Sequence, residues 1–301
     1  MLLSVILLVF VFVRASRGNS AKGPWNPSQP VPRKFGATAR VEEVATARVE
    51  EVASTHGNVT KDTFDAIYDY HIWEPDSTAD DNGGGSGPGS SMVYTRRTRA
   101  LVEMLIFKYN IGLLIDAPCG AMKWMSTVVD YVTNSAGANP KFQYVGLDIV
   151  ESVIMKNREA FSHIDNMHFE VKDLSREAIE APRGVSIPPA GQKTAIFSRD
   201  ALQHLNFDLV VSTMKRMAES SADIVILGSY HNKGTNKNIT TGEYFVIDLS
   251  KRPFSPWLPA PLEVVSEETS DYKHFAVYDR NELAQVDFDA MLHDARTHFG
   301  G

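Results

Sequence analysis

The sequence has a single cysteine, Cys119, among its 301 residues. One cysteine cannot form a disulfide within the chain, and the nine histidines show no spacing typical of metal ligands. The sequence also lacks a Lys/Arg-rich block, and its formal net charge is −7. These absences argue against a structural zinc module and against a nucleic-acid partner.

Long apolar runs are absent too, and none reaches the roughly 20 residues that a membrane-spanning helix requires. The longest, residues 2–13, is interrupted only by Ser4 and is followed by Arg14. Its length is typical of the apolar region of a signal peptide. We therefore expect residues 1–20 to be a signal peptide, with an uncleaved anchor as the alternative, and no stable membrane span. The protein is expected to be secreted or to lie in the lumen of the secretory pathway.

Residues 21–60 are expected to form a low-complexity linker. Its first part is rich in Ser, Gly, Pro and Asn, and residues 37–44 are then repeated without change as residues 45–52. Two copies of an octapeptide are too few for a solenoid. We expect one globular domain over residues 61–301, which begins with an aromatic-rich helix near 63–73. The Gly-rich segment 82–90 is read either as a plain linker or as a lid over a ligand.

Apolar runs and helical patterns alternate along the domain. Strands are predicted at 111–116, 142–148, 167–172, 194–198 and 223–229, and helices at 98–109, 121–133, 151–161 and 206–220. Two further strands, 263–267 and 274–278, are joined by a short polar turn. The pattern predicts an α/β fold: a doubly wound, mainly parallel seven-stranded sheet with a C-terminal antiparallel hairpin.

Acidic residues follow four of the predicted strands. The first strand runs into Asp-Ala-Pro-Cys-Gly at 116–120, the second ends at Asp148, and Asp173 and Asp200 follow the third and fourth. In a doubly wound sheet, ligands bind beyond these strand ends. A glycine after the first strand lets the backbone approach a ligand, and an acid after the second can accept hydrogen bonds from a ribose. The G-x-G-x-x-G dinucleotide fingerprint is absent.

The 116–120 stretch resembles the first motif of the class I S-adenosylmethionine-dependent methyltransferases, which usually reads Asp/Glu-x-Gly-x-Gly. Residues 201–205, Ala-Leu-Gln-His-Leu, resemble the Val-Leu-x-His-Leu stretch that often follows their fourth strand. The resemblance covers roughly residues 95–280 and implies S-adenosylmethionine as cofactor. It implies that residues 116–120 pass beneath the amino-acid part of the cofactor. It further implies that Asp148 accepts hydrogen bonds from the ribose hydroxyls and that Asp173, with Leu174, lies near the adenine amine. The implied cofactor-binding residues are Asp116, Ala117, Pro118, Cys119, Gly120, Asp148, Ile149, Asp173, Leu174 and Arg199.

Asp200 and His204 are the candidate catalytic residues. Their spacing of four places them on one face of a helix, if a helix begins at Asp200, and a carboxylate beside a histidine would raise its basicity. The alternative is that Asp200 only caps this helix and His204 packs beneath it. Trp124 either flanks the ligand or packs in the core.

The expected reaction is O-methylation of a glycan or a small hydroxylated acceptor, with no obligate protein partner. The polar loop 231–242 is expected to rim the acceptor site, so the glycosylation sequon at Asn238 would stay unused. The second sequon is at Asn58. A catalytically silent S-adenosylmethionine-binding module on the same fold is the main alternative. An NAD-type oxidoreductase would need the missing third glycine.

Overall fold

The computed structural model describes residues 58–73, 84–135, 137–232, 234–269 and 272–300. The expected signal segment, the two octapeptides and most of the expected linker lie outside the described residues. The first described helix, α2 (Val59–Asp69), starts slightly before the expected domain boundary at residue 61. The Asn58 side chain caps it by accepting a hydrogen bond of 3.3 Å from the Lys61 N–H.

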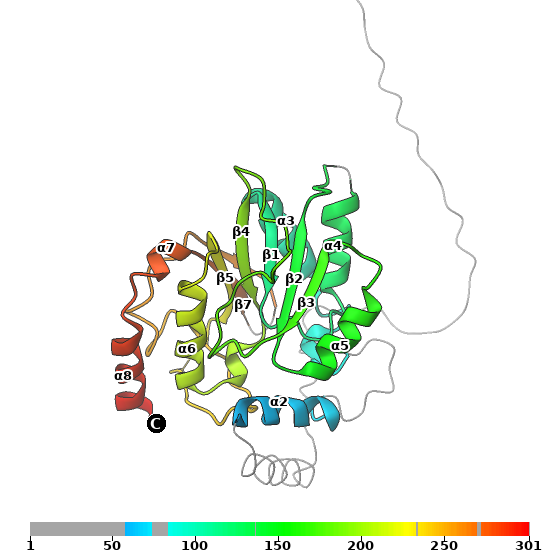
Figure 1. The fold of residues 1–301 in the computed structure, drawn as a ribbon. Coiled ribbons are helices and arrows are strands. Elements are labelled where there is room, and N and C mark those ends of the chain that lie inside the picture. Colours follow the sequence, from blue (N-terminus) through cyan, green and yellow to red (C-terminus); the bar gives the residue numbers. More distant parts are fainter. Residues whose placement is uncertain (1–57, 74–83, 136, 233, 270–271, 301) are drawn as a thin grey trace, which may run out of the picture. The chain divides into compact units, whose positions relative to one another are not determined.

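Seven strands form one sheet in the order β3-β2-β1-β4-β5-β7-β6. Strands β1 to β5 pair in parallel, whereas β7 is antiparallel to both β5 and β6 (Figure 1). The predicted fold class is therefore confirmed. The strands are β1 (Ile111–Asp116), β2 (Gln143–Asp148), β3 (Met167–Val171), β4 (Lys193–Ser198), β5 (Ile224–Tyr230), β6 (Glu263–Ser266) and β7 (Lys273–Asp279).

The position of β1 explains where a ligand can bind. All six residues of β1 are buried, as expected for an inner strand that is covered on both faces. From β1 the chain leads to β2 and β3 on one side and then returns to β4 on the other. The connections diverge between the carboxyl ends of β1 and β4, so no helix of the layers fills this point, where α/β sheets bind their ligands.

Helices cover both faces of the sheet. On one face, α3 (Arg96–Lys108), α4 (Met125–Asn134) and α5 (Glu151–Ala160) contribute to one apolar cluster with residues such as Leu105 and Val128. On the other face, α6 (Phe207–Ala218), α7 (Arg280–Leu283) and α8 (Phe288–Phe299) contribute to a second cluster. The four predicted helices are present, with shifted ends.

Two helix boundaries have a clear local cause. Helix α4 begins at Met125 and not at 121, because the chain first makes a turn in which Gly120 has a φ of 55°. Helix α8 was not predicted. It has a recognisable start, since the Asp287 side chain accepts a hydrogen bond of 2.9 Å from the Ala290 N–H.

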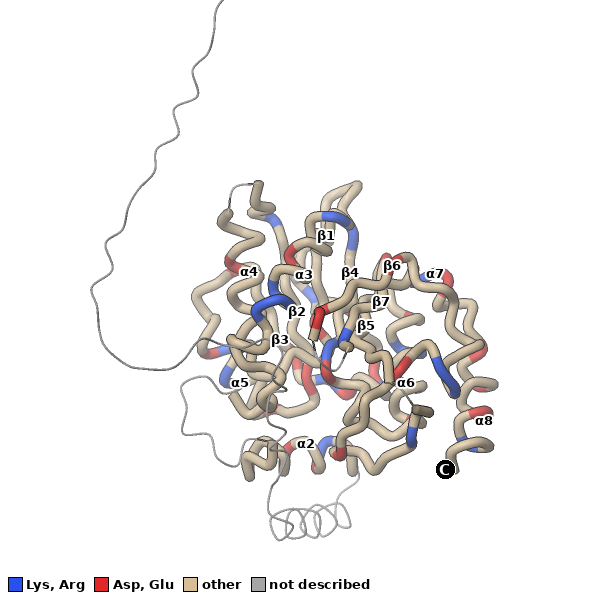
Figure 2. Tube along the Cα trace, turned by 180° about the vertical axis from the view of Figure 1, so that it is seen from behind, with Lys and Arg blue, Asp and Glu red and all other residues tan. Residues whose placement is uncertain are grey.

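Lys and Arg segments and Asp and Glu segments are both spread over the described elements (Figure 2). Several form surface pairs, such as Arg296 with Asp208 between α8 and α6 and Lys215 with Asp289 between the same helices. These pairs are exposed and contribute little stability each.

Candidate active site

A pocket lies at the carboxyl ends of β1, β2, β3 and β4, and α2 forms one of its walls. The structure brings together all of the predicted site residues except Ala117, which is fully buried behind the lining and donates its N–H to the Phe197 carbonyl at 2.8 Å. The predicted residues that line the pocket are Asp116, Pro118, Cys119, Gly120, Asp148, Ile149, Asp173, Leu174, Arg199, Asp200 and His204.

The turn after β1 needs its glycine. Gly120 has a positive φ, and a Cβ at this position would lie 2.6 Å from the Ser86 hydroxyl. The Gly120 N–H donates to the Asp148 carboxylate at 3.0 Å, so the turn is tied to the end of β2. Pro118 stands where the methyltransferase motif has its first glycine, and Cys119 packs towards Gly146 of β2. Burial raises the pKa of the Cys119 thiol, which therefore stays protonated.

Two buried carboxyl groups form the floor below this turn. Burial raises the pKa of Asp148 to about 6, although the Gly120 and Val150 N–H groups donate to its carboxylate and act against this shift. Burial also raises the pKa of Asp116 to about 8, despite a hydrogen bond of 2.7 Å from the Tyr144 hydroxyl. At neutral pH Asp116 is thus largely protonated and Asp148 largely ionised.

Asp173, after β3, is already hydrogen-bonded on both oxygens. One oxygen accepts from the Ser175 N–H and hydroxyl, at 3.0 and 2.6 Å, and the other accepts from the Asn58 side-chain amide at 3.1 Å. The start of α2 is thereby fastened to the end of β3.

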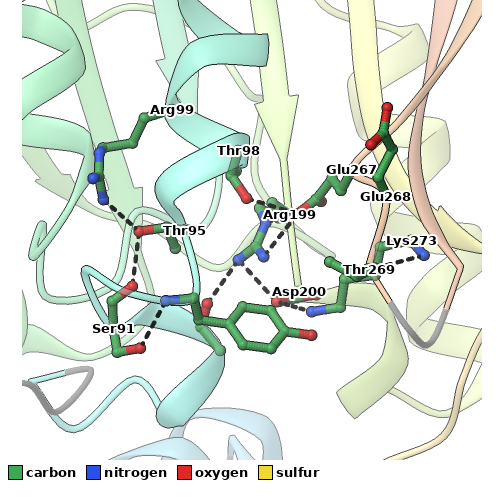
Figure 3. Close-up of polar contacts among 12 residues, drawn as sticks. Ser91, Thr95, Thr98, Arg99, Arg199, Asp200, Glu267, Glu268, Thr269 and Lys273 are labelled. Carbon is green, nitrogen blue, oxygen red and sulfur yellow. Dashed lines mark hydrogen bonds and ion pairs between the residues drawn. The ribbon is translucent and has the colours of Figure 1, made fainter. Parts of the chain in front are cut away.

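Asp200 does not have the environment of a general base. One carboxylate oxygen pairs with Lys273 at 2.7 Å and with Arg199 at 2.9 Å (Figure 3). The other accepts from the Tyr230 hydroxyl and the Gln203 amide, both at 3.0 Å. Burial alone would raise the pKa of Asp200, but the two cations outweigh it and hold that pKa well below its usual range. A carboxylate of such low basicity is poorly matched to proton removal near neutral pH.

Asp200 and His204 are not paired as the sequence suggested. Asp200 has a φ of 53°, and the residues after it form a short 3₁₀ turn, η2 (Leu202–His204), so no α-helix begins there. Asp200 therefore bonds to Gln203, three residues on, and does not hydrogen-bond to the histidine. The predicted helix-face pairing of these two residues is wrong for this reason.

His204 instead takes its orientation from a backbone carbonyl. Its Nδ1 lies 2.8 Å from the Glu243 oxygen, which makes Nδ1 the protonated nitrogen and leaves Nε2 with a lone pair. Burial lowers the pKa of His204, so the neutral ring is favoured. Its ring packs against Trp73 at a centroid distance of 4.5 Å and against Tyr244 at 5.5 Å.

Arg199 joins three segments that are distant in sequence. Its guanidinium donates to both oxygens of Glu267, at 3.2 and 3.1 Å, and to the Gly89 carbonyl at 3.1 Å. Glu267 also accepts from the Thr98 hydroxyl of α3 at 2.6 Å (Figure 3). We refer to Arg199, Asp200, Glu267 and Lys273 as the buried charge cluster. It contains two cations and two carboxylates.

The sequence analysis missed several residues of the pocket wall. Helix α2 and the residues after it contribute aromatic side chains, and the 82–90 segment contributes two serines. The Ser86 hydroxyl accepts from the Ala121 N–H at 3.0 Å and lies 2.7 Å from the Tyr68 hydroxyl. The aromatic pattern predicted a helix against the domain but carried no information on which end of the sheet it covers. The missed residues include Thr60, Phe64, Tyr68, Trp73, Ser86, Ser90, Ser175, Phe197, Leu209 and Thr213.

The loop 231–242, expected to rim the acceptor site, has side chains that hydrogen-bond within the protein. The Asn236 amide is buried and bonds to the Asp248 and Arg252 carbonyls, both at 2.8 Å. The Asn238 side chain accepts from the Phe207 N–H at 2.8 Å and donates to the Gly300 carbonyl at 2.9 Å. Neither side chain belongs to the pocket lining. The expected role of this loop as a rim is therefore not supported by its described contacts.

Two kinds of feature are absent from the described part of the chain. Within the described ranges, no group of three or more His, Cys, Asp or Glu side chains is placed to hold a metal ion. No helix among the described residues is long and apolar enough to cross a membrane.

No protein-family model matches the sequence, and no curated protein matches it. Solved structures resemble it in fold. Human N-acetylserotonin methyltransferase, in complex with SAM, is 12% identical, with 81% of this chain and 68% of that chain covered and a TM-score of 0.49. Magnesium protoporphyrin IX methyltransferase from Synechocystis PCC 6803, with bound SAM, is 12% identical over 62% of this chain and 79% of that one, with a TM-score of 0.41.

PKMT2 from Rickettsia typhi, in complex with AdoHcy, is also 12% identical, with a TM-score of 0.30. The match covers 40% of this chain and only 22% of the length of that protein. The strand order, with its closing antiparallel β7, is that of the class I methyltransferase sheet.

Proposed function

We propose that this protein transfers a methyl group from S-adenosylmethionine to the oxygen of a small hydroxylated acceptor or a glycan. The observation that carries the proposal is His204, whose ring lines the pocket beside the end of β4 with its Nδ1 fixed by the Glu243 carbonyl. Such a ring has one nitrogen ready to accept a proton from an acceptor hydroxyl.

The residues of the pocket fit the cofactor. The Asp148 carboxylate accepts two backbone N–H groups and has further lone pairs for ribose hydroxyls. The Ser198 and Thr213 hydroxyls are buried in the lining without a hydrogen-bond partner among the described residues. Buried hydroxyls of this kind are costly unless a ligand or water satisfies them, so they favour a polar ligand in the pocket.

We assign the cofactor to Asp116, Pro118, Cys119, Gly120, Asp148, Ile149, Asp173 and Leu174, with Arg199 supporting the end of β4. S-adenosylmethionine supplies a methyl group on a sulfonium, which needs no further activation. The protein has to align the acceptor oxygen with the methyl group, and this alignment is the larger part of its task.

The proton goes to His204 in this mechanism. The acceptor oxygen forms a bond to the methyl carbon while its proton moves to Nε2 of His204, and the methyl–sulfur bond breaks with its electron pair on sulfur. The products are a methyl ether, S-adenosylhomocysteine and a protonated imidazole. Asp200 holds Lys273, Arg199 and Tyr230 in place and takes no proton.

The deciding experiment combines binding with transfer. We expect a thermal shift with S-adenosylmethionine and S-adenosylhomocysteine but none with NAD, and at 100 times the dissociation constant the gain is about 2.7 kcal/mol. Labelled cofactor should then pass its methyl group to hydroxylated acceptors. Binding without transfer to any acceptor would favour the silent module, and no shift with either sulfur compound would contradict the proposal.

A further inference from the structure

Aromatic rings line the pocket around His204. Trp73, which follows α2, lies 4.5 Å from the His204 ring and makes edge contacts with Phe64 at 6.1 Å and Tyr68 at 6.3 Å. Trp124 also lines the pocket and is in edge contact with Phe197 at 6.2 Å. The proposed base, His204, therefore lies in a pocket that is lined by aromatic rings.

The cation in this pocket is already neutralised. Arg199 is the only Lys or Arg among the described lining residues, and its side chain is 3% exposed. Glu267 takes two of its donors, and the Gly89 carbonyl and Asp200 take Nη1. Lys273, behind it, is bound to Asp200. An anionic acceptor would have to break these buried pairs to reach a positive charge, at considerable cost.

Carboxyl groups, in contrast, are concentrated in the lining. Asp148 and Asp173 lie at the ends of the adjacent strands β2 and β3, whereas the charges of Asp200 and Glu267 are balanced by Arg199 and Lys273. The field of Asp148 and Asp173 repels a negatively charged acceptor, because like charges in a poorly solvated site interact strongly.

Several polar side chains of the lining are hydrogen-bonded within the protein, whereas the Ser198 and Thr213 hydroxyls have no partner among the described residues. Ser86 is bonded to Ala121 and Tyr68, and Asp200 has four partners. A sugar with several hydroxyl groups would lose hydrogen bonds to water here and gain few in return. A flat ring with one hydroxyl group loses much less and gains ring contacts.

We infer that the acceptor is an uncharged aromatic ring bearing the hydroxyl group that is methylated, with Trp73 as the ring that selects for aromaticity. This inference rests on the proposed function and narrows its acceptor class. The phenolic oxygen reacts as described above, with its proton passing to His204.

Matched ligands test the two parts of this inference separately. Protein saturated with S-adenosylhomocysteine would be titrated by calorimetry with p-cresol and trans-4-methylcyclohexanol, which differ in aromaticity. It would then be titrated with 4-hydroxybenzamide and 4-hydroxybenzoate, which have the same shape and differ in charge. We expect p-cresol to bind roughly two- to tenfold more tightly than the cyclohexanol, and the amide to bind at least about tenfold more tightly than the benzoate.

A pair of variants assigns the aromatic preference to one side chain. Trp73→Leu should remove the preference for p-cresol over the cyclohexanol, and Trp73→Phe should keep it. Tyr131→Leu is the control, since Tyr131 is 47% exposed and contacts Phe107 on the outer side of α4. If Trp73→Leu weakens both ligands equally, its ring does not select for aromaticity and the inference is overturned.

The outcomes separate this inference from the proposed function. Failure of S-adenosylhomocysteine to bind would overturn both. Cofactor binding with equal affinities within each ligand pair, or with methyl glucoside bound more tightly than p-cresol, would overturn the aromatic acceptor alone.

Discussion

The Arg199 guanidinium and the Glu267 carboxylate, 68 residues apart in sequence, pair through two hydrogen bonds inside the protein. Both side chains are almost completely buried, at 3% and 1% exposure. The pair joins the end of β4 to the segment that connects β6 and β7, so the antiparallel hairpin supports the pocket without lining it.

Glu267→Gln should destabilise the fold by about 3–5 kcal/mol, because it removes one of the two carboxylates that neutralise the buried Arg199 guanidinium and Lys273. The free energy of unfolding in urea measures this effect. Glu268→Gln is the matched control, since Glu268 is 64% exposed and pairs with Arg97 at the surface. Its expected cost is below about 1 kcal/mol. Equal losses of unfolding free energy in both variants would show that the buried pair contributes no more stability than the surface pair.

His204→Ala should lower turnover by about 10²–10⁴-fold and leave the affinity for S-adenosylhomocysteine unchanged, since the ring acts on the acceptor. Steady-state kinetics and calorimetry together test this. Burial lowers the pKa of His204, so in the wild type the rate should begin to fall only below the ordinary histidine pKa of about 6.5. An acid limb above that value, or full turnover in His204→Ala, would remove His204 as the base.

Asp116→Asn should change how stability depends on pH. The folded pKa of about 8 lies above the unfolded value of about 3.9, so the folded state holds a proton that the unfolded state releases. Stability from this group is complete below the unfolded pKa and is lost as the pH rises towards 8. The free energy of unfolding of the variant, relative to that of the wild type, should therefore rise by about 1.4 kcal/mol per pH unit between roughly pH 5 and 7.5. The free energy of unfolding in urea measures this at each pH. If it changes with pH in the same way for the variant and the wild type, the prediction is contradicted.

Asp148→Ala should weaken S-adenosylhomocysteine binding by about 1.5–3 kcal/mol through loss of the ribose contact. It should also lower stability, because the Gly120 and Val150 N–H groups lose their acceptor. Calorimetry and urea unfolding separate the two effects. Unchanged affinity would mean that β2 does not carry the ribose site.

We further propose that residues 1–20 direct secretion, and a fusion of residues 1–30 to a reporter tests this directly. Secreted protein should carry no glycan at Asn238, whose side chain bonds to Phe207 and Gly300. Its intact mass would reveal one. A reporter that stays in the cytosol would contradict the first statement, and a glycan at Asn238 of the folded protein would contradict the second.

The sequence was most informative where structure is local. Continuous apolar runs ending in Asp116 and Asp148 specify inner parallel strands, and strand direction alone then brings those acids together. The Asp200–His204 pairing could not be judged in this way. It depended on a helix starting at Asp200, whereas Asp200 has a positive φ and its carboxylate is bound by Lys273 and Tyr230, which are distant in sequence.

Contacts between distant segments were beyond sequence reasoning for a related reason. Glu267 and Lys273 belong to a hairpin that was predicted. Their partners, Arg199 and Asp200, directly follow β4 and are reached only after the sheet is assembled. In the same way, the aromatic residues of α2 predicted a packed helix. Their position over the strand ends depends on contacts such as Asn58 with Asp173.

The charge balance of the buried cluster also bears on how the protein responds to ionic strength. Two cations and two carboxylates cancel, and Arg199, Glu267 and Lys273 are each at most 6% exposed, so added salt has little to screen there. Exposed pairs such as Arg296 with Asp208 are screened over the same range of salt. The arrangement of Arg199 and Asp200 at the end of β4 should accordingly be the same in dilute buffer and in concentrated salt. The exposed ion pairs between α6 and α8 should weaken as salt is added.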